Sequence, residues 1–317
     1  MEQEFSSTRI AIVGAGNVGA TYAYALLQSG LAGEIVLMDA NQAKAEGEVM
    51  DLNHAVPFVH PTKIWAGDYK DCKGAAITVI TAGAGQKPGE TRLELVHKNI
   101  SIFKQIIPQV VENNPEGLLL IATNPVDILS YASWKISGLP YAKVIGSGTI
   151  LDTARFRYLL SEHAGVDPRS VHAYIIGEHG DSEVPVWSLA NIAGMRLKDY
   201  CIANCKSYTQ EVWDEIFKQT RDAAYQIIER KGATYYAVAN GLVRITEAIL
   251  RDQDTVLSIS TLIRDYDGID DVYLSLPSIV SRNGITRNLN LTLSDEEMEG
   301  LKRSAALLRN IIDQLDI

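Results

Sequence analysis

The chain has 317 residues, of which 46% are hydrophobic and 21% are charged, and these proportions are ordinary for a soluble protein long enough for two domains. Its formal net charge of −10 disfavours nucleic acid and anionic membranes as partners, so an anionic substrate would need local arginines. No apolar run reaches the ~20 residues of a membrane helix, and residues 1–9 lack the apolar core of a signal peptide, so we expect a cytoplasmic protein.

The first predicted element is an apolar strand over 8–13, which leads directly into a glycine-rich turn. A helix over 20–30 and a second strand over 34–39 follow, and this strand ends at Asp39. Such an order is the dinucleotide-binding signature when the turn reads GxGxxG. The Asp39 carboxylate would accept hydrogen bonds from a ribose diol and repel a 2′-phosphate, which favours NAD over NADP. The alternative is a glycine-rich turn without a ligand.

The turn itself reads Gly14-Ala15-Gly16-Asn17-Val18-Gly19. Gly14 would make the tight turn, Gly16 would let a pyrophosphate approach the backbone, and Gly19 would let the helix pack on the strand. The phosphates would then lie at the positive end of the helix, beside Asn17 and Val18.

Helices and strands continue to alternate through the first half of the chain. We predict helices over 41–53 and 93–111, and strands over 63–66, 75–82, 118–122 and 144–146. This alternation predicts an α/β protein with a doubly wound parallel sheet, the Rossmann fold. Ligands bind at the carboxyl ends of such strands, so the candidate binding loops are those after Val13, Ala82, Ala122 and Gly146.

Two of these loops carry candidate functional residues. One begins at Gly83 and Ala84, contains three glycines and a proline, and lacks a hydrophobic anchor, so we interpret it as a mobile lid that could carry Arg92. The other contains Asn124-Pro125, which fixes a turn and leaves the Asn124 amide at the rim of the cofactor cleft. The alternatives are an ordinary surface loop and plain turn chemistry.

A helix predicted after Gly148 carries three charged residues of interest. Thr149 is a candidate N-cap, with Asp152 three residues further on as in a capping box. Asp152 and Arg155 share a helix face, whereas Arg157 lies about 200° around the helix from Arg155 and points away. The alternatives are a simple capping acid and a solvated charged face.

An apolar strand from Val171 leads past His172 to His179. This second histidine lies between two glycines in Gly177-Glu178-His179-Gly180-Asp181-Ser182. Histidine changes charge nearest to neutral pH, and it can present one ring nitrogen to a ligand and the other to a carboxylate. The alternative is a turn with an exposed histidine.

The remaining chain predicts a mixed α+β region. It contains helices over 208–230 and 234–250, antiparallel strands over 255–263, 272–276 and 285–291, and a final amphipathic helix opened by a capping box at Ser294. We therefore place a domain boundary near Gly148. The first domain, 1–148, would bind NAD, and the second, 149–317, would be the catalytic α+β domain.

The three cysteines are Cys72, Cys201 and Cys205. They form no disulfide framework, and their odd number suggests a reducing compartment. Cys201 and Cys205 could share a helix face, but a metal ion would need two more ligands, and none has suitable spacing. We therefore expect these cysteines to serve packing and predict no metal site.

Four motifs together resemble the L-lactate and malate dehydrogenase family over essentially the whole chain. They are the glycine-rich turn, Thr123-Asn124-Pro125-Val126-Asp127, Leu151-Asp152-Thr153-Ala154-Arg155 and the His179 segment. Within this family, Gln86-Lys87-Pro88-Gly89-Glu90-Thr91-Arg92 resembles the lactate branch, and the bacterial enzymes in particular. One departure is Ala55, where glycine is frequent in the family, and it touches no proposed role.

The resemblance implies a catalytic group of four residues. His179 would donate a proton to the substrate ketone and take it back in the reverse direction. Asp152 would hold the other ring nitrogen and favour the charged imidazole. Arg155 would grip the substrate carboxylate with its two-pronged guanidinium, and Arg92 would arrive on the lid to polarise the carbonyl.

The resemblance also implies the walls of the site. Asn124 would bind the substrate and help to place the nicotinamide, together with Gly83 and Ala84 on the cofactor side, and Thr234 would line the far side of the substrate pocket. Malate enzymes of this family carry arginine at the position of Gln86. A glutamine there would leave the second carboxylate of oxaloacetate buried and unpaired, so we predict fermentative reduction of pyruvate to L-lactate.

Three alternative functions remain open at this point. The chain could act on malate or another 2-hydroxy acid, and Gln86 argues against malate. It could be an NAD-dependent glycosidase, but these need metal ligands such as a cysteine near the catalytic centre, and none lies by His179 in the sequence. It could be a dehydrogenase-derived binding protein, which would have lost His179, Asp152 or Arg155.

Arg157 and His172 resemble the pair that binds fructose 1,6-bisphosphate between subunits of bacterial lactate dehydrogenases. The direction of Arg157, away from Arg155, agrees with a separate site. Ordinary surface charge is the alternative. The family also implies a homotetramer.

Overall fold

The computed structural model describes residues 8–85, 89, 91–205 and 207–317. Six parallel strands form the larger part of its main sheet, in the order β6-β5-β4-β1-β2-β3. These strands are β1 (Arg9–Val13), β2 (Glu34–Met38), β3 (Lys63–Ala66), β4 (Ile77–Ile80), β5 (Leu118–Ile121) and β6 (Val144–Gly146). The strand order reverses between β1 and β4, and a doubly wound sheet binds its ligands at such a point.

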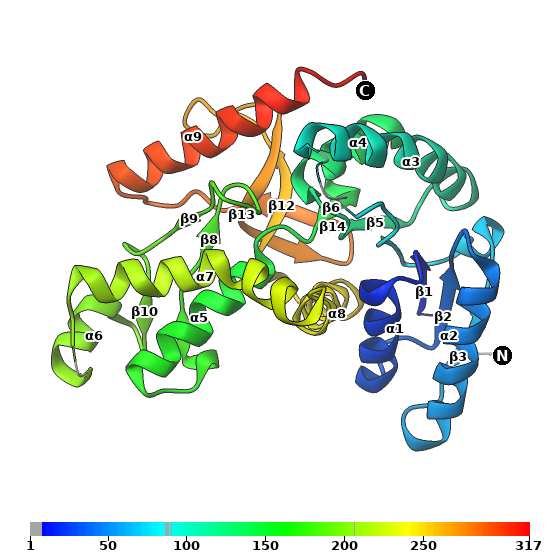
Figure 1. The fold of residues 1–317 in the computed structure, drawn as a ribbon, viewed down its shortest axis with the longest axis horizontal. Coiled ribbons are helices and arrows are strands. Elements are labelled where there is room, and N and C mark those ends of the chain that lie inside the picture. Colours follow the sequence, from blue (N-terminus) through cyan, green and yellow to red (C-terminus); the bar gives the residue numbers. More distant parts are fainter. Residues whose placement is uncertain (1–7, 86–88, 90, 206) are drawn as a thin grey trace.

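Helices cover both faces of this sheet (Figure 1). They are α1 (Asn17–Ser29), α2 (Gln42–Ala55), α3 (Arg92–Asn113) and α4 (Val126–Ser137). Side chains of β1 alternate between the faces, because Ile10 and Ile12 pack in the core that contains α1 and α2, whereas Ala11 and Val13 pack in the core that contains α3 and α4. The predicted Rossmann arrangement therefore rests on two hydrophobic cores, one on each side of the sheet.

The second half of the chain begins with α5 (Ile150–Ala164) and continues through short strands and long helices. The helices are α6 (Leu197–Asn204), α7 (Gln210–Lys231), α8 (Tyr236–Leu250) and α9 (Asp295–Ile312), and the short strands are β7 (Val171–His172), β8 (Ile175–Ile176), β9 (Val184–Pro185), β10 (Asn191–Ile192) and β11 (Met195–Arg196). Helices α5, α6 and α7 share a third core with β7 and β8. This part carries His179 between β8 and β9.

Three antiparallel strands extend the main sheet beyond β6. They are β12 (Thr255–Ile263), β13 (Val272–Ser281) and β14 (Gly284–Asn288), and β12 joins the parallel strands where Ser260 pairs with Gly146. The strands predicted over 255–263, 272–276 and 285–291 therefore exist, but they belong to one nine-stranded sheet with the first half.

The two halves also meet through helices. In Figure 1, α8 is seen nearly end-on beside α1, and these helices contact each other. The hydroxyls of Tyr22 in α1 and Thr246 in α8 form a buried hydrogen bond of 2.6 Å. No helix of the described chain is both long and apolar enough to span a bilayer.

The predicted capping box of α5 is wrong. Thr149 is the N-cap residue but makes no side-chain cap bond, because its hydroxyl donates to the Ile175 carbonyl at 2.6 Å. The Asp152 carboxylate is engaged elsewhere, by His179 and Arg155. At the other end of the chain, the predicted capping box of α9 is confirmed by the reciprocal bonds between Ser294 and Glu297.

The prediction for two of the cysteines also needs correction. Cys201 and Cys205 were expected only to pack, but their sulfurs are joined as a disulfide. Cys201 lies in α6 and Cys205 caps it, so one helical turn places both side chains on the same face. Cys72 is buried and free.

Candidate active site

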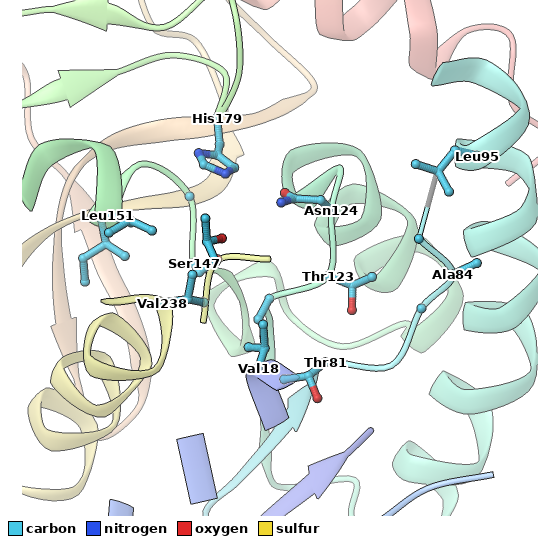
Figure 2. Close-up of a pocket in the computed structure, with 16 residues that line it drawn as sticks. Val18, Thr81, Ala84, Leu95, Thr123, Asn124, Ser147, Leu151, His179 and Val238 are labelled. Atoms are coloured by element: carbon cyan, nitrogen blue, oxygen red, sulfur yellow. The ribbon is translucent and has the colours of Figure 1, made fainter. Parts of the chain in front are cut away.

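A cavity of about 330 Å³ opens at the carboxyl ends of the parallel strands. Figure 2 shows His179 at one end of this cavity and Val18 and Thr81 at the other, with Asn124 and Ser147 between them. Loops after β4, β5 and β6 supply most of the wall, and the rest includes Thr234, just before α8, and Val238, in its first turn. Of the residues predicted to bind cofactor or substrate, the cavity wall contains Val18, Gly83, Ala84, Asn124, His179 and Thr234.

The glycine-rich turn fits a phosphate-binding role. Gly14 has φ of +115°, and a Cβ on Gly19 would lie 1.9 Å from the Gly14 carbonyl oxygen, so packing within the protein requires both glycines. A Cβ on Gly16 would have no protein atom within 4 Å. Space is therefore free beside Gly16, at the N-terminus of α1, whose first turn contains no acidic residue.

Asp39 holds this turn from the end of β2. Its Oδ2 accepts the Ala15 N–H at 2.7 Å, and its Oδ1 accepts the Asn41 N–H at 2.8 Å. These bonds fix the carboxylate beside the glycine-rich turn, where the sequence places the ribose of a dinucleotide.

His179 and Asp152 form the central pair of the site. Their Nδ1 and Oδ2 atoms are 2.5 Å apart, and Asp152 is only 2% exposed. Burial lowers the pKa of His179, but the charge and hydrogen bond of Asp152 outweigh it, and the pKa rises from 6.5 to about 9. Burial raises the pKa of Asp152, but His179 and Arg155 bring it below its ordinary value. The pair therefore favours a protonated imidazole beside an ionised carboxylate.

The backbone of His179 has its own anchor, which the sequence analysis did not identify. Asp127, at the start of α4, accepts the His179 N–H at 2.8 Å and the Ser260 hydroxyl at 2.6 Å. Burial raises the pKa of Asp127 to about 6, despite these two hydrogen bonds. A single buried acid thus ties the His179 loop to α4 and β12.

Arg155 shares the Asp152 carboxylate with His179 and is absent from the cavity wall described above. Its Nη1 donates to Asp152 Oδ1 at 2.9 Å, and its side chain is 13% exposed. Asp152 therefore holds His179 with one oxygen and Arg155 with the other. This shared carboxylate fixes the two predicted catalytic cations relative to each other.

Glu183 is a second acid to which the sequence analysis gave no role. It is 6% exposed, and its Oε1 has no hydrogen-bond partner within the described chain. Burial and the charge of Asp152 raise its pKa to about 9, against the opposing effects of His179, Arg155 and Arg221. Glu183 is consequently a neutral acid close to the catalytic charges at neutral pH.

Asn99, in α3, connects two loops of the cavity. Its amide accepts the Ala84 N–H at 2.7 Å and donates to the carbonyls of Ala84 and Asn124, at 3.4 and 3.1 Å. It is fully buried within an amphipathic helix, so only the fold could identify it. The Asn124 amide remains at the cavity wall, as predicted from the sequence.

Two predicted site residues cannot be placed. Gln86 lies outside the described residues, and Arg92 is placed only as the first residue of α3. Thr91 and Glu94 form a reciprocal capping box there, which fixes where the lid predicted over 83–92 joins the helix.

Arg157 and His172 lie apart from the cavity. Arg157 Nε donates to the Ala173 carbonyl at 2.9 Å, and its guanidinium lies 5.1 Å from the ring centre of Tyr174. His172 is exposed and pairs with Asn191 on the neighbouring strand. Arg157 therefore contacts the two residues that directly follow His172 in the chain, Ala173 and Tyr174.

Two family models match consecutive segments of the chain. A family model described as lactate/malate dehydrogenase, NAD binding domain, matches residues 8–146, and one described as lactate/malate dehydrogenase, alpha/beta C-terminal domain, matches residues 149–316. The chain is 53% identical to L-lactate dehydrogenase 1 of Clostridium acetobutylicum over 98% of this chain and 99% of that protein. It is 55% identical to the L-lactate dehydrogenase of Acetivibrio thermocellus over 98% of each chain.

Solved structures show the same similarity. The minor L-lactate dehydrogenase of Enterococcus mundtii, in a ligands-bound form, has a TM-score of 0.95 at 39% identity, with 98% of this chain and 99% of that chain covered. A lactate dehydrogenase from a deep-sea metagenome library of the Medee basin has a TM-score of 0.94 at 46% identity, over 97% and 98% of the two chains. These comparisons confirm the predicted fold class and NAD as the cofactor.

Proposed function

The chain belongs to the lactate/malate dehydrogenase family, and from this we propose that it is an NAD-dependent L-lactate dehydrogenase that interconverts pyruvate and (S)-lactate. The observation that carries the proposal is the His179–Asp152 pair at one end of a cavity whose other end is the glycine-rich turn. The proposed role is fermentative reduction of pyruvate in the cytoplasm.

In the proposed reaction, each residue of the site has a separate role. The reduced nicotinamide, when bound, supplies a hydride to the ketone carbon. His179 donates its proton to the ketone oxygen, and Asp152 stabilises the charged imidazole beforehand. Arg155 is fixed through Nη1, so its other N–H groups bind the substrate carboxylate as a two-pronged donor. Asn124, on the cavity wall, hydrogen-bonds the substrate, and Arg92 polarises the carbonyl from the lid.

Substrate choice is assigned to Gln86. A neutral residue at this position would suit the methyl group of pyruvate, whereas the second carboxylate of oxaloacetate would be buried without a partner. NADH oxidation, followed by its absorbance, should be much faster with pyruvate than with oxaloacetate. The Q86R variant should shift the preference toward oxaloacetate. A wild-type preference for oxaloacetate would contradict the assignment.

Regulation by fructose 1,6-bisphosphate is proposed for the surface near Arg157 and His172. Both residues lie in the region around Ala173 and are absent from the cavity wall, so a phosphate bound there would act without entering the cavity. We also propose that the working form is a homotetramer. The bisphosphate should lower the KM for pyruvate in the wild type but not in R157Q or H172A. Light scattering with and without the effector would give the oligomeric state, and an unchanged KM with the tetramer intact would argue against the effector site.

A further inference from the structure

His163, Cys201 and Cys205 gather at a place that is separate from the active-site cavity. His163 lies in the last turn of α5, Cys201 lies in α6, and Cys205 caps α6. One ring nitrogen of His163 and the two sulfurs all lie within 4.8 Å of one another. Cys201 is buried, whereas His163 and Cys205 are partly exposed, so the cluster is open to solvent on one side. The fold therefore supplies a third ligand, His163, that local spacing in the sequence did not indicate.

The tautomer of His163 suits metal binding. Its Nε2 lies 2.9 Å from the Ser207 carbonyl oxygen, which can only accept, so Nε2 carries the proton. Nδ1 then holds the free lone pair. A histidine that binds a metal with one nitrogen commonly donates the other N–H to a backbone carbonyl, which fixes the ring and its tautomer. The ring is also held edge-on to Trp213, with 5.4 Å between ring centres.

The electrostatic environment favours a cation. Helix α5 ends at Ala164 and α6 ends at Asn204, so the C-terminal turns of two helices lie at the cluster. Helix C-termini carry partial negative charge and stabilise positive charge nearby. Two thiolates would balance the charge of a divalent ion, and sulfur with imidazole nitrogen is the ligand set that Zn²⁺ prefers.

We propose that His163, Cys201 and Cys205 form a redox-gated site for a thiophilic divalent cation such as Zn²⁺. With the disulfide formed, the sulfurs are not available as thiolates and the site binds no metal. A small dithiol reduces this bond to two thiols and is itself converted to a disulfide. Binding of the cation then displaces the two thiol protons, and water completes the tetrahedral coordination.

The test uses the full chain and Co²⁺ as a spectroscopic substitute for Zn²⁺. Protein reduced with dithiothreitol and freed of the reagent under argon should bind one Co²⁺ per chain, with thiolate-to-cobalt charge-transfer absorption. Protein oxidised with a small disulfide should lack this absorption. Thiol counting after denaturation should give three thiols in the reduced sample and one, Cys72, in the oxidised sample. Absence of Co²⁺ binding to reduced protein, or equal binding to the oxidised form, overturns the proposal.

Substitutions distinguish loss of metal binding from loss of the disulfide. H163Q keeps both cysteines and a side-chain donor for the Ser207 carbonyl, so the disulfide should still form while Co²⁺ affinity falls at least ~10-fold. C205S should lose both the disulfide and the charge-transfer band. C72S is the matched control, because it removes a buried cysteine outside the cluster and should leave Co²⁺ binding unchanged. Wild-type affinity in H163Q overturns the site as proposed.

Discussion

The proton on His179 sets the pH range of the proposed reaction. Asp152 keeps the imidazole charged up to about pH 9, and pyruvate reduction needs that charged form. For the wild type, kcat/KM for pyruvate should therefore be level near neutral pH and should fall as pH rises through about 9. In D152N the fall should move toward the ordinary histidine value of 6.5, with roughly 10²-fold lower kcat/KM at pH 8. An unchanged pH profile in D152N would show that Asp152 does not control this proton.

The same pKa shift has a consequence for stability. The folded-state pKa of His179 is raised, so its contribution to the free energy of unfolding is fully present below pH 6.5 and is lost as pH rises through about 9. D152N should weaken this pH dependence, which urea unfolding at several pH values would measure.

Glu183, unlike His179, should lower the stability of the protein at neutral pH. Because burial raises the pKa of this acid to about 9, folding near neutral pH requires Glu183 to take up a proton, which lowers stability. Glutamine has nearly the same shape and needs no proton, so E183Q should unfold at higher urea concentration than the wild type. The gain should be larger at pH 8 than at pH 5. E183Q should also keep kcat/KM for pyruvate within a few-fold at pH 7, and a tenfold loss would mean that Glu183 acts there as an ionised group.

Individual site residues were predictable when their chemistry is local. His179, Asp152 and Asn124 stand in short motifs, and the structure places the first two within hydrogen-bond distance and His179 and Asn124 at one cavity. Asp127 and Asn99 were not predictable, because their roles depend on contacts that the fold creates, with Ser260 for Asp127 and with the backbone of Ala84 for Asn99. No spacing rule connects such positions before the fold is known.

At the scale of elements, the glycine-rich turn separates protein packing from cofactor binding. G19A should destabilise the chain by roughly 1–3 kcal/mol, because its Cβ would meet the Gly14 carbonyl oxygen. G16A should leave stability within about 0.5 kcal/mol, because Gly16 has an ordinary φ of −75° and no protein atom near its Cβ position. The added methyl group of G16A would instead occupy the space for the pyrophosphate. It should weaken NADH binding at least tenfold, a loss of binding free energy comparable to that of one hydrogen bond.

The measurements are urea unfolding without cofactor and fluorescence titration with NADH. G47A is the matched control, since Gly47 lies within α2 with no neighbour near its Cβ position and alanine favours the helix. It should bind NADH normally. Normal NADH binding by G16A as well would contradict the assignment of the phosphate site.

Elements were predictable where the hydrophobic pattern has a clear period. The strands over 63–66, 144–146 and 255–263 were predicted with the bounds that the structure has. Helix α4 was not predicted from the sequence, because residues from Val126 to Ser133 are all buried and leave no solvent-exposed face. The capping box predicted at Thr149 does not form, because the side chains of Thr149 and Asp152 bond to other partners, the Ile175 carbonyl and Arg155.

At the scale of the whole molecule, the two family models divide the chain into two parts, whereas one sheet runs through both parts. The models meet between 146 and 149, near the boundary proposed at Gly148. Yet β12 continues the sheet beside β6, and α8 shares a core with α1. Because burial is continuous across the proposed boundary, we expect the halves to unfold together.

The buried bond between Tyr22 and Thr246 tests this cooperation directly. Y22F removes one hydroxyl from the contact between α1 and α8, and should lower the free energy of unfolding by about 1 kcal/mol. Urea unfolding at fixed protein concentration should show one transition, coincident by circular dichroism and tryptophan fluorescence, that moves to lower urea without a change of slope. Two separate transitions in Y22F would mean that the halves fold independently, because loss of one contact between them would then uncouple their unfolding.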